Sequence, residues 1–357
     1  MIRSSCVSRW VWSPVLSLVL VLHLAWFLVL RGFYWPVRMV SALRAWRLFA
    51  KANRVADAWM AQHLSQENLR PAQRRRYLRY ARNTLGLVAI QPPFQSTGWN
   101  WPRRESSIGA AYGVCIPLFD DCFDLLDLEA ARTFGKAFQA SLSDPIWRPN
   151  AVPLGMPDAP HLLRTVSTLL FAEVRPEDQL RFTELLREMT DAQLESLDER
   201  LTATPIEQRR QISTRKGVAS FQLLLVAIGQ VEAANSPALA AAAEWAQWMD
   251  DYDDLESDAA QGSWTYIAHL HATNEALSFL ESQLDAVSES LNQAFNGSGR
   301  LFADVLSLNF VIKVAHRRTW VMAQKWGVGQ HMPRFFWKGG TPDDSGTLVG
   351  PERRGQL

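Results

Sequence analysis

An acidic cluster between residues 247 and 258 limits most strongly what this chain can form. The run Gln247-Trp-Met-Asp-Asp-Tyr-Asp-Asp-Leu-Glu-Ser-Asp258 places five aspartates and one glutamate within nine residues, between apolar flanks typical of helices in a globular domain. On a helix, Asp250, Asp254 and Asp258 recur at every fourth position and share a face. Like charges at this spacing repel by roughly 0.2–0.5 kcal/mol per pair. Taken alone, such a cluster indicates either a solvated acidic face or a site that binds cations.

A second acidic run lies 130 residues earlier and favours the cation site. Asp120-Asp121-Cys-Phe-Asp124 repeats the Asp-Asp-x-x-Asp spacing within an apolar segment that contains Phe119 and Phe123. An apolar segment does not carry several aspartates for solubility, so we expect both runs to offer carboxylates to one cavity. Oxygen ligands without a histidine or cysteine pattern favour Mg²⁺, which keeps several waters and bridges carboxylates to substrate phosphates.

The two runs resemble the paired Asp-rich motifs of the class I isoprenoid synthases. Gln247-x-x-Asp250-Asp251-x-x-Asp254-x-x-x-Asp258 is similar to the second motif of trans-prenyl diphosphate synthases, and Asp120-Asp121-x-x-Asp124 is similar to the first. Lys216-Gly217-x-x-Ser220 is similar to the segment with which these enzymes hold diphosphate. The resemblance covers roughly residues 100–325. It implies an all-α fold, a single large helical bundle with a central apolar cavity.

The resemblance also implies which residues form the site. Mg²⁺ is the expected cofactor and a prenyl diphosphate the expected substrate, which ionises to an allylic carbocation in a cavity that excludes water. The expected catalytic and metal-binding residues are Asp120, Asp121, Asp124, Asp250, Asp251 and Asp254, with Asp258 as a further metal ligand. The expected diphosphate-binding residues are Lys216, Arg215, Arg317 and Arg318, although Arg317 and Arg318 also fit a surface pair.

Several departures from the family pattern keep more than one function open. The Gly-Lys-Arg and Arg-Arg-Gly segments of chain-elongating synthases are absent, and so is the Asn-Asp-x-x-Ser motif of many terpene cyclases. The remaining pattern is most similar to bacterial large-terpene synthases of the tetraprenyl-curcumene type. We therefore expect a terpene synthase that cyclises or eliminates. The alternatives are a prenyltransferase that joins two isoprenoid diphosphates and a non-catalytic helical membrane protein.

An apolar run near the N-terminus predicts attachment to a membrane. Residues Trp10 to Leu30 form a run of 21 that is broken by few polar residues. A helix of this length crosses a hydrocarbon layer of roughly 30 Å. Basic residues dominate after the run, and no acid precedes Asp57, which places the body of the protein on the cytoplasmic side. A secretory signal and a buried core helix are the alternatives to this transmembrane helix.

The remaining sequence predicts helices throughout and four regions. These are a membrane anchor at 1–35, a helical basic linker at 36–99, the catalytic domain at 100–330 and a disordered tail at 331–357. In the linker, the basic patch fits either anionic lipid or solvent; it contains Arg70, Arg74, Arg75, Arg76, Arg79 and Arg82. Small residues at 109–113 predict close approach between helices.

A net charge of +1 does not favour binding to nucleic acid. The expected partners are the prenyl diphosphate substrate, membrane lipid and a second copy of the chain in a homodimer.

Overall fold

A computed structural model describes residues 3–31, 36–65, 69–91, 103–124, 126–153, 159–199, 204–260 and 264–326. Every regular element in these residues is helical, which confirms the predicted all-α class. The chain divides into two compact units, Ala45–Ala303 on the one hand and Met1–Arg44 with Asp304–Leu357 on the other. Residues 71–90 of the predicted basic linker lie in the same unit as the acidic motifs. The predicted region boundaries stay a prediction. The predicted disordered tail at 331–357 lies outside the described residues.

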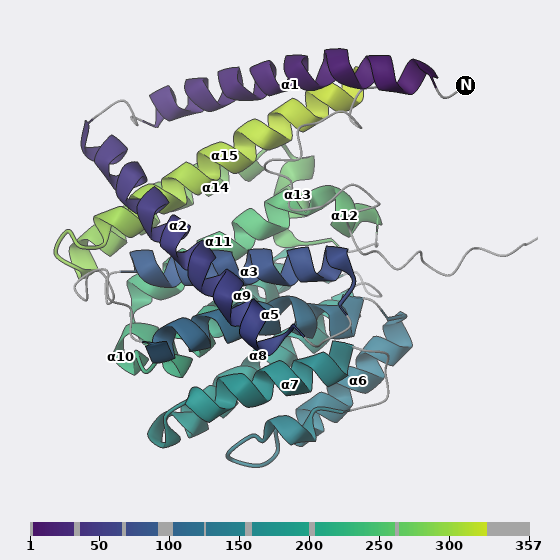
Figure 1. Cartoon of the computed structure of the whole chain (residues 1–357), viewed down its shortest axis with the longest axis vertical. Helices are drawn as coiled ribbons and strands as arrows, with labels where there is room; N and C mark the ends of the chain where they lie inside the picture. Colours follow the sequence, from purple (N-terminus) through teal and green to yellow (C-terminus); the bar gives the residue numbers. More distant parts are fainter. Residues whose placement is uncertain are drawn as a thin grey trace, which may run out of the picture. The chain divides into compact units, whose positions relative to one another are not determined.

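The helices are labelled in Figure 1. They are α1 Arg3–Leu30, α2 Pro36–His63, α3 Pro71–Ile90, α5 Arg103–Asp124, α6 Leu128–Ser141, α7 Ala159–Glu173, α8 Gln179–Glu199, α9 Ile206–Ala227, α10 Val231–Ala234, α11 Pro237–Asp253, α12 Leu255–Ala260, α13 Tyr266–Ala272, α14 Ala276–Ala294 and α15 Arg300–Lys325. Short 3₁₀ turns occupy Pro149–Ala151 and Pro176–Asp178.

Within the unit of residues 45–303, α5 lies at the centre of one group of helices. It packs against α3 and α7, while α9 packs against α8 and α11 (Figure 1). The predicted close approach at residues 109–113 is confirmed at Gly113, where a Cβ atom would lie 2.6 Å from the Cα of Ala81 on α3. Only glycine allows the two backbones to come this close, so this position sets the distance between α3 and α5.

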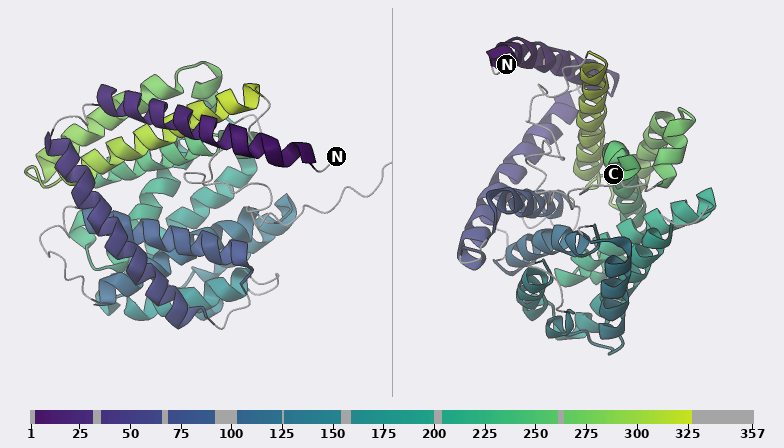
Figure 2. Two further views of the ribbon diagram at one scale, coloured as in Figure 1. Left: turned by 45° about the horizontal axis from the view of Figure 1, so that its top comes forward. Right: turned by 90° about the vertical axis from the view of Figure 1, so that its right-hand side faces the viewer.

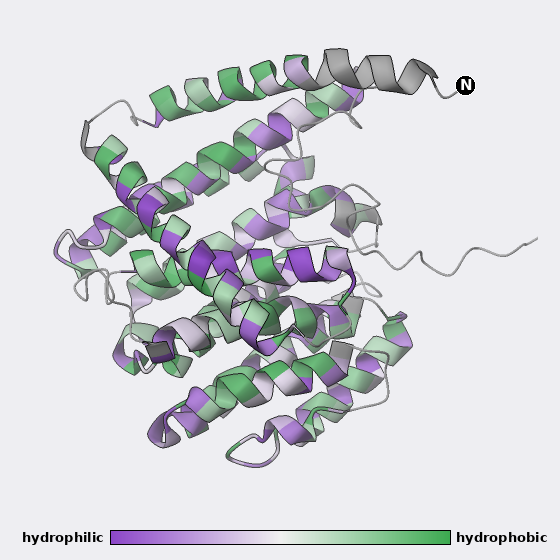
Figure 3. Cartoon of the chain, in the orientation of Figure 1, coloured by the Kyte–Doolittle hydropathy of each residue, from purple (hydrophilic) through white to green (hydrophobic). Residues whose placement is uncertain are grey.

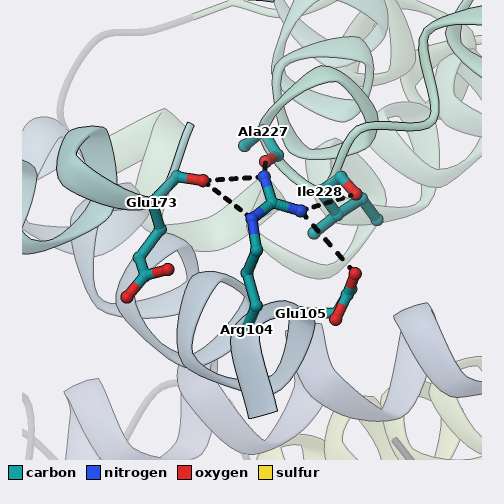
Figure 4. A network of polar contacts seen from close by, with 5 residues as sticks. All are labelled: Arg104, Glu105, Glu173, Ala227 and Ile228. Atoms are coloured by element: carbon teal, nitrogen blue, oxygen red, sulfur yellow. Dashed lines mark hydrogen bonds and ion pairs between the residues drawn. The ribbon is translucent and has the colours of Figure 1, made fainter. Parts of the chain in front are cut away.

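An arginine at the start of α5 joins three helices. The Arg104 guanidinium donates to the backbone carbonyls of Glu173, Ala227 and Ile228, which lie at the C-terminal ends of α7 and α9 (Figure 4). The last carbonyls of a helix have no partner within the helix, and the helix dipole makes that end negative. Arg104 therefore satisfies two helix ends at once and fixes α5 relative to α7 and α9.

The unit of residues 1–44 and 304–357 contains α1, the first part of α2 and most of α15. The two helices α1 and α15 meet near the C-terminal end of α15 (Figure 2), where His23 and Thr319 form a side-chain hydrogen bond of 2.8 Å. Within the described part of the chain, none of the helices combines the length and apolarity needed to span a bilayer.

Candidate active site

A cavity of about 140 Å³ lies within the unit of residues 45–303. By the same measure a water molecule needs roughly 10–15 Å³, so the cavity has space for roughly ten waters. Its polar lining comes largely from α3, α5, α9 and α11, and includes Tyr80, Tyr112, Asp120, Lys216, Ser220, Gln247 and Asp250, with Ser167 of α7 in addition. The lining from α6, α7 and α8 is mostly apolar, with Phe138, Leu163, Leu170, Phe182, Leu186 and Met189. The cavity thus has a charged side and an apolar side.

The first aspartate of each acidic motif lines this cavity. Asp120 lies near the C-terminal end of α5 and Asp250 near the C-terminal end of α11, and both are half-buried. Lys216 on α9 also lines the cavity, so two carboxylates and one ammonium group border the same space. Residues separated by 130 positions in the sequence are brought together, as the sequence analysis expected.

The second aspartate of each motif is buried and hydrogen-bonded to a neighbouring helix. Asp121 accepts from the Arg76 guanidinium and, at 3.2 Å, from the Tyr77 hydroxyl of α3. Asp251 accepts from the Ser213 hydroxyl at 2.7 Å and from the Gln247 amide at 2.9 Å. Neither Asp121 nor Asp251 is part of the cavity lining. This arrangement favours a positioning role for both residues, and their expected role as metal ligands stays a prediction.

Helix α3 contributes functional candidates that the sequence analysis did not assign to the site. Burial, together with the nearby charges of Asp120 and Asp254, raises the pKa of Tyr80 to about 12. Tyr80 therefore interacts electrostatically with one carboxylate from each acidic motif. The start of this helix is strongly hydrophilic (purple in Figure 3). Solvent and anionic lipid were the two partners predicted for its basic patch, and the acidic motifs were not considered.

Two arginines of α3 belong to this electrostatic network. Burial opposes the charged form of Arg76, but the charge of Asp121, its hydrogen bond with Arg76 and the nearby Tyr80 and Asp120 together outweigh that effect and raise the pKa of Arg76. Burial lowers the pKa of Arg79, while the charges of Asp254 and Asp253 act in the opposite direction. Tyr77 and Tyr80 alternate with these arginines along the helix, and this pattern was the available signal that one face of α3 is buried.

The helix expected to carry Asp250, Asp254 and Asp258 on a single face is interrupted. Helix α11 ends at Asp253, and Asp258 lies on the separate helix α12. The helix is therefore not continuous through the cluster, and the face shared by the three aspartates stays a prediction. The negative end of the helix dipole disfavours acidic side chains in the last turn, which accounts for an end at this cluster. Asp124 is the last residue of α5, and its side chain lies outside the described residues.

The other predicted diphosphate ligands have different surroundings from Lys216. Arg215 donates to both carboxylate oxygens of Glu195, at 3.0 and 2.8 Å, and is not part of the cavity lining. Arg317 and Arg318 lie on the portion of α15 that belongs to the other unit, so their role stays a prediction. Lys216 is the member of this set that borders the cavity.

Mg²⁺ fits the cavity only when substrate phosphates supply part of its ligands. Among the residues with described side chains, no three histidine, cysteine, aspartate or glutamate side chains gather closely enough to hold a metal ion by themselves. Protein sites for Mg²⁺ commonly use one or two carboxylates, with substrate phosphates and waters as the remaining ligands. Asp120 and Asp250 can supply these two carboxylates on the charged side of the cavity.

Asp127 follows the first acidic motif and caps a helix. Its carboxylate accepts a 2.9 Å hydrogen bond from the backbone N–H of Ala130 at the start of α6, and its side chain is exposed. Asparagine caps helices as well as aspartate does, whereas alanine costs about 1 kcal/mol. We therefore expect Asp127→Asn to keep both stability and turnover, and Asp127→Ala to lower the free energy of unfolding by about 1 kcal/mol. Urea denaturation of both variants measures this difference, and loss of turnover in Asp127→Asn at unchanged stability would contradict the assignment.

Comparison with protein-family models finds no match for this chain, and comparison with curated proteins finds none either.

Proposed function

We propose that this protein is a Mg²⁺-dependent terpene synthase that ionises an allylic prenyl diphosphate and then cyclises the product or eliminates a proton. The observation that carries the proposal is the composition of a single cavity. Asp120, Asp250 and Lys216 border it together with an apolar wall. A diphosphate needs cations on one side, and a prenyl chain needs an apolar surface on the other. The resemblance to class I isoprenoid synthases agrees with this chemistry.

The reaction begins with departure of the diphosphate. Asp120 and Asp250 would hold the metal, and Lys216 adds a positive charge beside the same space. When bound, Mg²⁺ neutralises the diphosphate and stabilises it as a leaving group. The C–O bond breaks, its electron pair leaves with the diphosphate, and an allylic carbocation remains.

The apolar side of the cavity then stabilises the carbocation and keeps water away from it. Phe119, Phe138 and Trp147 line the cavity, and each aromatic face stabilises a nearby cation by ~0.5–2 kcal/mol. Exclusion of water prevents capture of the cation as an alcohol. Cyclisation forms a new C–C bond, and loss of a proton from a neighbouring carbon gives a neutral hydrocarbon. The released diphosphate can accept that proton.

The decisive experiment measures products and pyrophosphate release. Purified protein with Mg²⁺ is incubated with geranyl, farnesyl or geranylgeranyl diphosphate, and the products are identified by gas chromatography with mass spectrometry. We expect pyrophosphate release and a terpene hydrocarbon from at least one substrate, and no release in the presence of EDTA. If no substrate releases pyrophosphate and none binds, the chain is a non-catalytic helical protein, and the proposal is wrong.

A prenyltransferase is the second candidate, and the position of α3 favours it. Arg76 forms an ion pair with Asp121 of the first motif, and the charges of Asp254 and Asp253 of the second motif act on Arg79. Such a pair of cations can hold the diphosphate of a second substrate. Isopentenyl diphosphate added to the same incubations separates the two functions. A longer prenyl diphosphate that appears only with both substrates would identify the protein as a prenyltransferase.

Metal and diphosphate together are expected to stabilise the unit that contains the cavity. A ligand at a hundredfold excess over its Kd stabilises the native state by about 2.7 kcal/mol. We therefore expect Mg²⁺ with pyrophosphate to raise the melting temperature by several degrees, and either one alone to raise it less. Differential scanning fluorimetry with EDTA, Mg²⁺, pyrophosphate and both ligands measures the shift. The double variant Asp120→Asn with Asp250→Asn is the control and should not respond.

A further inference from the structure

Helix α1 presents a continuous apolar stripe to its surroundings. Val15, Leu18, Leu22, Trp26 and Val29 recur at intervals of three and four residues, and all are exposed. The exposed fractions reach 60% for Leu18, 59% for Leu22 and 61% for Trp26. Figure 3 shows that the described turns of this helix are mostly hydrophobic. Exposed apolar surface of this extent marks a site of interaction with a protein or a membrane.

The opposite face of α1 is already occupied within its own unit. Leu16, Leu20 and Phe27 are buried, and His23 forms its 2.8 Å hydrogen bond with Thr319 of α15. The Arg318 guanidinium lies 4.9 Å from the centre of the Phe27 ring. These contacts fix the rotation of α1 about its own axis. The apolar stripe is therefore the free side of a helix whose other side is held by α15.

The start of α2, in the same unit, also exposes apolar side chains, together with a positive charge. Met39, Val40 and Leu43 are exposed, and the exposed Arg44 follows directly. Residues 1–44 contain five arginines and no aspartate or glutamate. A second copy on this face would bring two such cationic surfaces together, and like charges repel. An anionic bilayer instead offers apolar tails to the stripe and negative headgroups to the arginines.

We propose that this face of α1 and the start of α2 binds the surface of an anionic bilayer, with α1 lying in the membrane plane. Leu18, Leu22 and Trp26 enter the boundary between headgroups and acyl chains, while the side of α1 that carries His23 and Phe27 stays on α15. This geometry differs from the membrane-spanning anchor that the length of the apolar run predicted. The proposal does not depend on the proposed catalytic activity.

Vesicle flotation with the full-length chain tests this proposal. The vesicles consist of phosphatidylcholine alone or of equal parts phosphatidylcholine and phosphatidylglycerol. We expect the protein to float with the anionic vesicles and at least tenfold less with the neutral ones. Leu18→Glu combined with Leu22→Glu should lower the bound fraction at least tenfold, because two apolar anchors are lost and two negative charges are added. Arg44→Gln should lower it roughly fivefold, since each cation near an anionic surface contributes about 1 kcal/mol.

Leu180→Glu on α8 is the matched control, because Leu180 is also an exposed leucine, at 50%. It should leave flotation unchanged, and circular dichroism should show equal helicity for all variants. Alkaline carbonate should release the bound protein from the vesicles. Failure to float, or equal flotation of the Leu18/Leu22 variant, would overturn the proposal. Resistance to carbonate would indicate a spanning helix. A dimer in analytical ultracentrifugation that this variant dissociates would assign the stripe to a second copy.

Discussion

Asp120→Asn and Asp250→Asn are each expected to slow pyrophosphate release by about a thousandfold, equivalent to ~4 kcal/mol of transition-state stabilisation. Both carboxylates line the same cavity as Lys216. Asparagine keeps the size of the side chain and removes its charge, so the change weakens metal binding with little loss of packing. Because both side chains are half-buried rather than fully buried, the melting temperature without ligands should change little.

Controls for this expectation come from an aspartate just after the first motif and from one within the second. Asp127→Asn changes an exposed cap, and Asp253→Asn changes a residue that is not part of the cavity lining; both should keep most of the activity. Turnover is measured as pyrophosphate release at saturating Mg²⁺ for all four variants. Equal losses in all four, or losses confined to Asp127 and Asp253, would show that the cavity is not the active site.

Asp121→Asn and Asp251→Asn should behave differently from both groups. Asp121 is buried against Arg76, and removing its charge leaves a partly buried guanidinium without its main counter-charge. Hydrogen bonds to charged groups contribute about 1.5–3 kcal/mol, so a loss of stability of that order should accompany any loss of turnover. A variant that loses turnover at unchanged stability would instead indicate a direct role in metal binding.

Much of the fold could be predicted from the sequence, because helical signals are local. The helical patterns along the sequence and the family resemblance predicted an all-α chain, and the small residues around Gly113 predicted a close helix contact. The ordered pair of acidic motifs predicted that Asp120 and Asp250 share a cavity. The helical pattern and the small residues are local signals, whereas the shared cavity was predicted from the ordered pair of motifs and their resemblance to a family.

The parts that sequence analysis missed depend on contacts between distant residues. The partners of Asp121 on α3 are separated from it by 44 and 45 residues, and Arg104 reaches carbonyls 69 to 124 residues away. The tyrosines beside Arg76 and Arg79 indicated a buried face, but no local pattern identified Asp121 as the partner of Arg76. The end of α11 at Asp253 was missed because residue spacing alone cannot register the cost of negative charge at a helix C-terminus.

Gly217→Val is expected to lower the free energy of unfolding by about 3 kcal/mol and to abolish turnover. Gly217 on α9 faces α11, where an added Cβ would lie 2.5 Å from the Cβ of Gln247 and 3.2 Å from the carbonyl oxygen of Ala243. The Ala243 carbonyl oxygen is a backbone atom of α11, and the Gln247 Cβ is bonded directly to that backbone. The clash is therefore relieved only when α9 and α11 move apart. A glycine within a helix costs about 1 kcal/mol relative to alanine, and here that cost allows the close approach.

The same separation should disturb the site more than it disturbs the fold. Lys216 precedes Gly217 on α9, while Gln247 and Asp250 lie on α11, and these three side chains border the cavity. Moving the helices apart therefore separates the Lys216 ammonium group from the Asp250 carboxylate that is expected to bind the metal.

Gly297→Ala is the control, because an added Cβ there has no atom within 4 Å and meets only the cost of a positive φ, about 1 kcal/mol. Chemical denaturation and pyrophosphate release measure the two effects in parallel. If Gly217→Val keeps normal turnover, the close contact between α9 and α11 does not position Lys216 for the reaction.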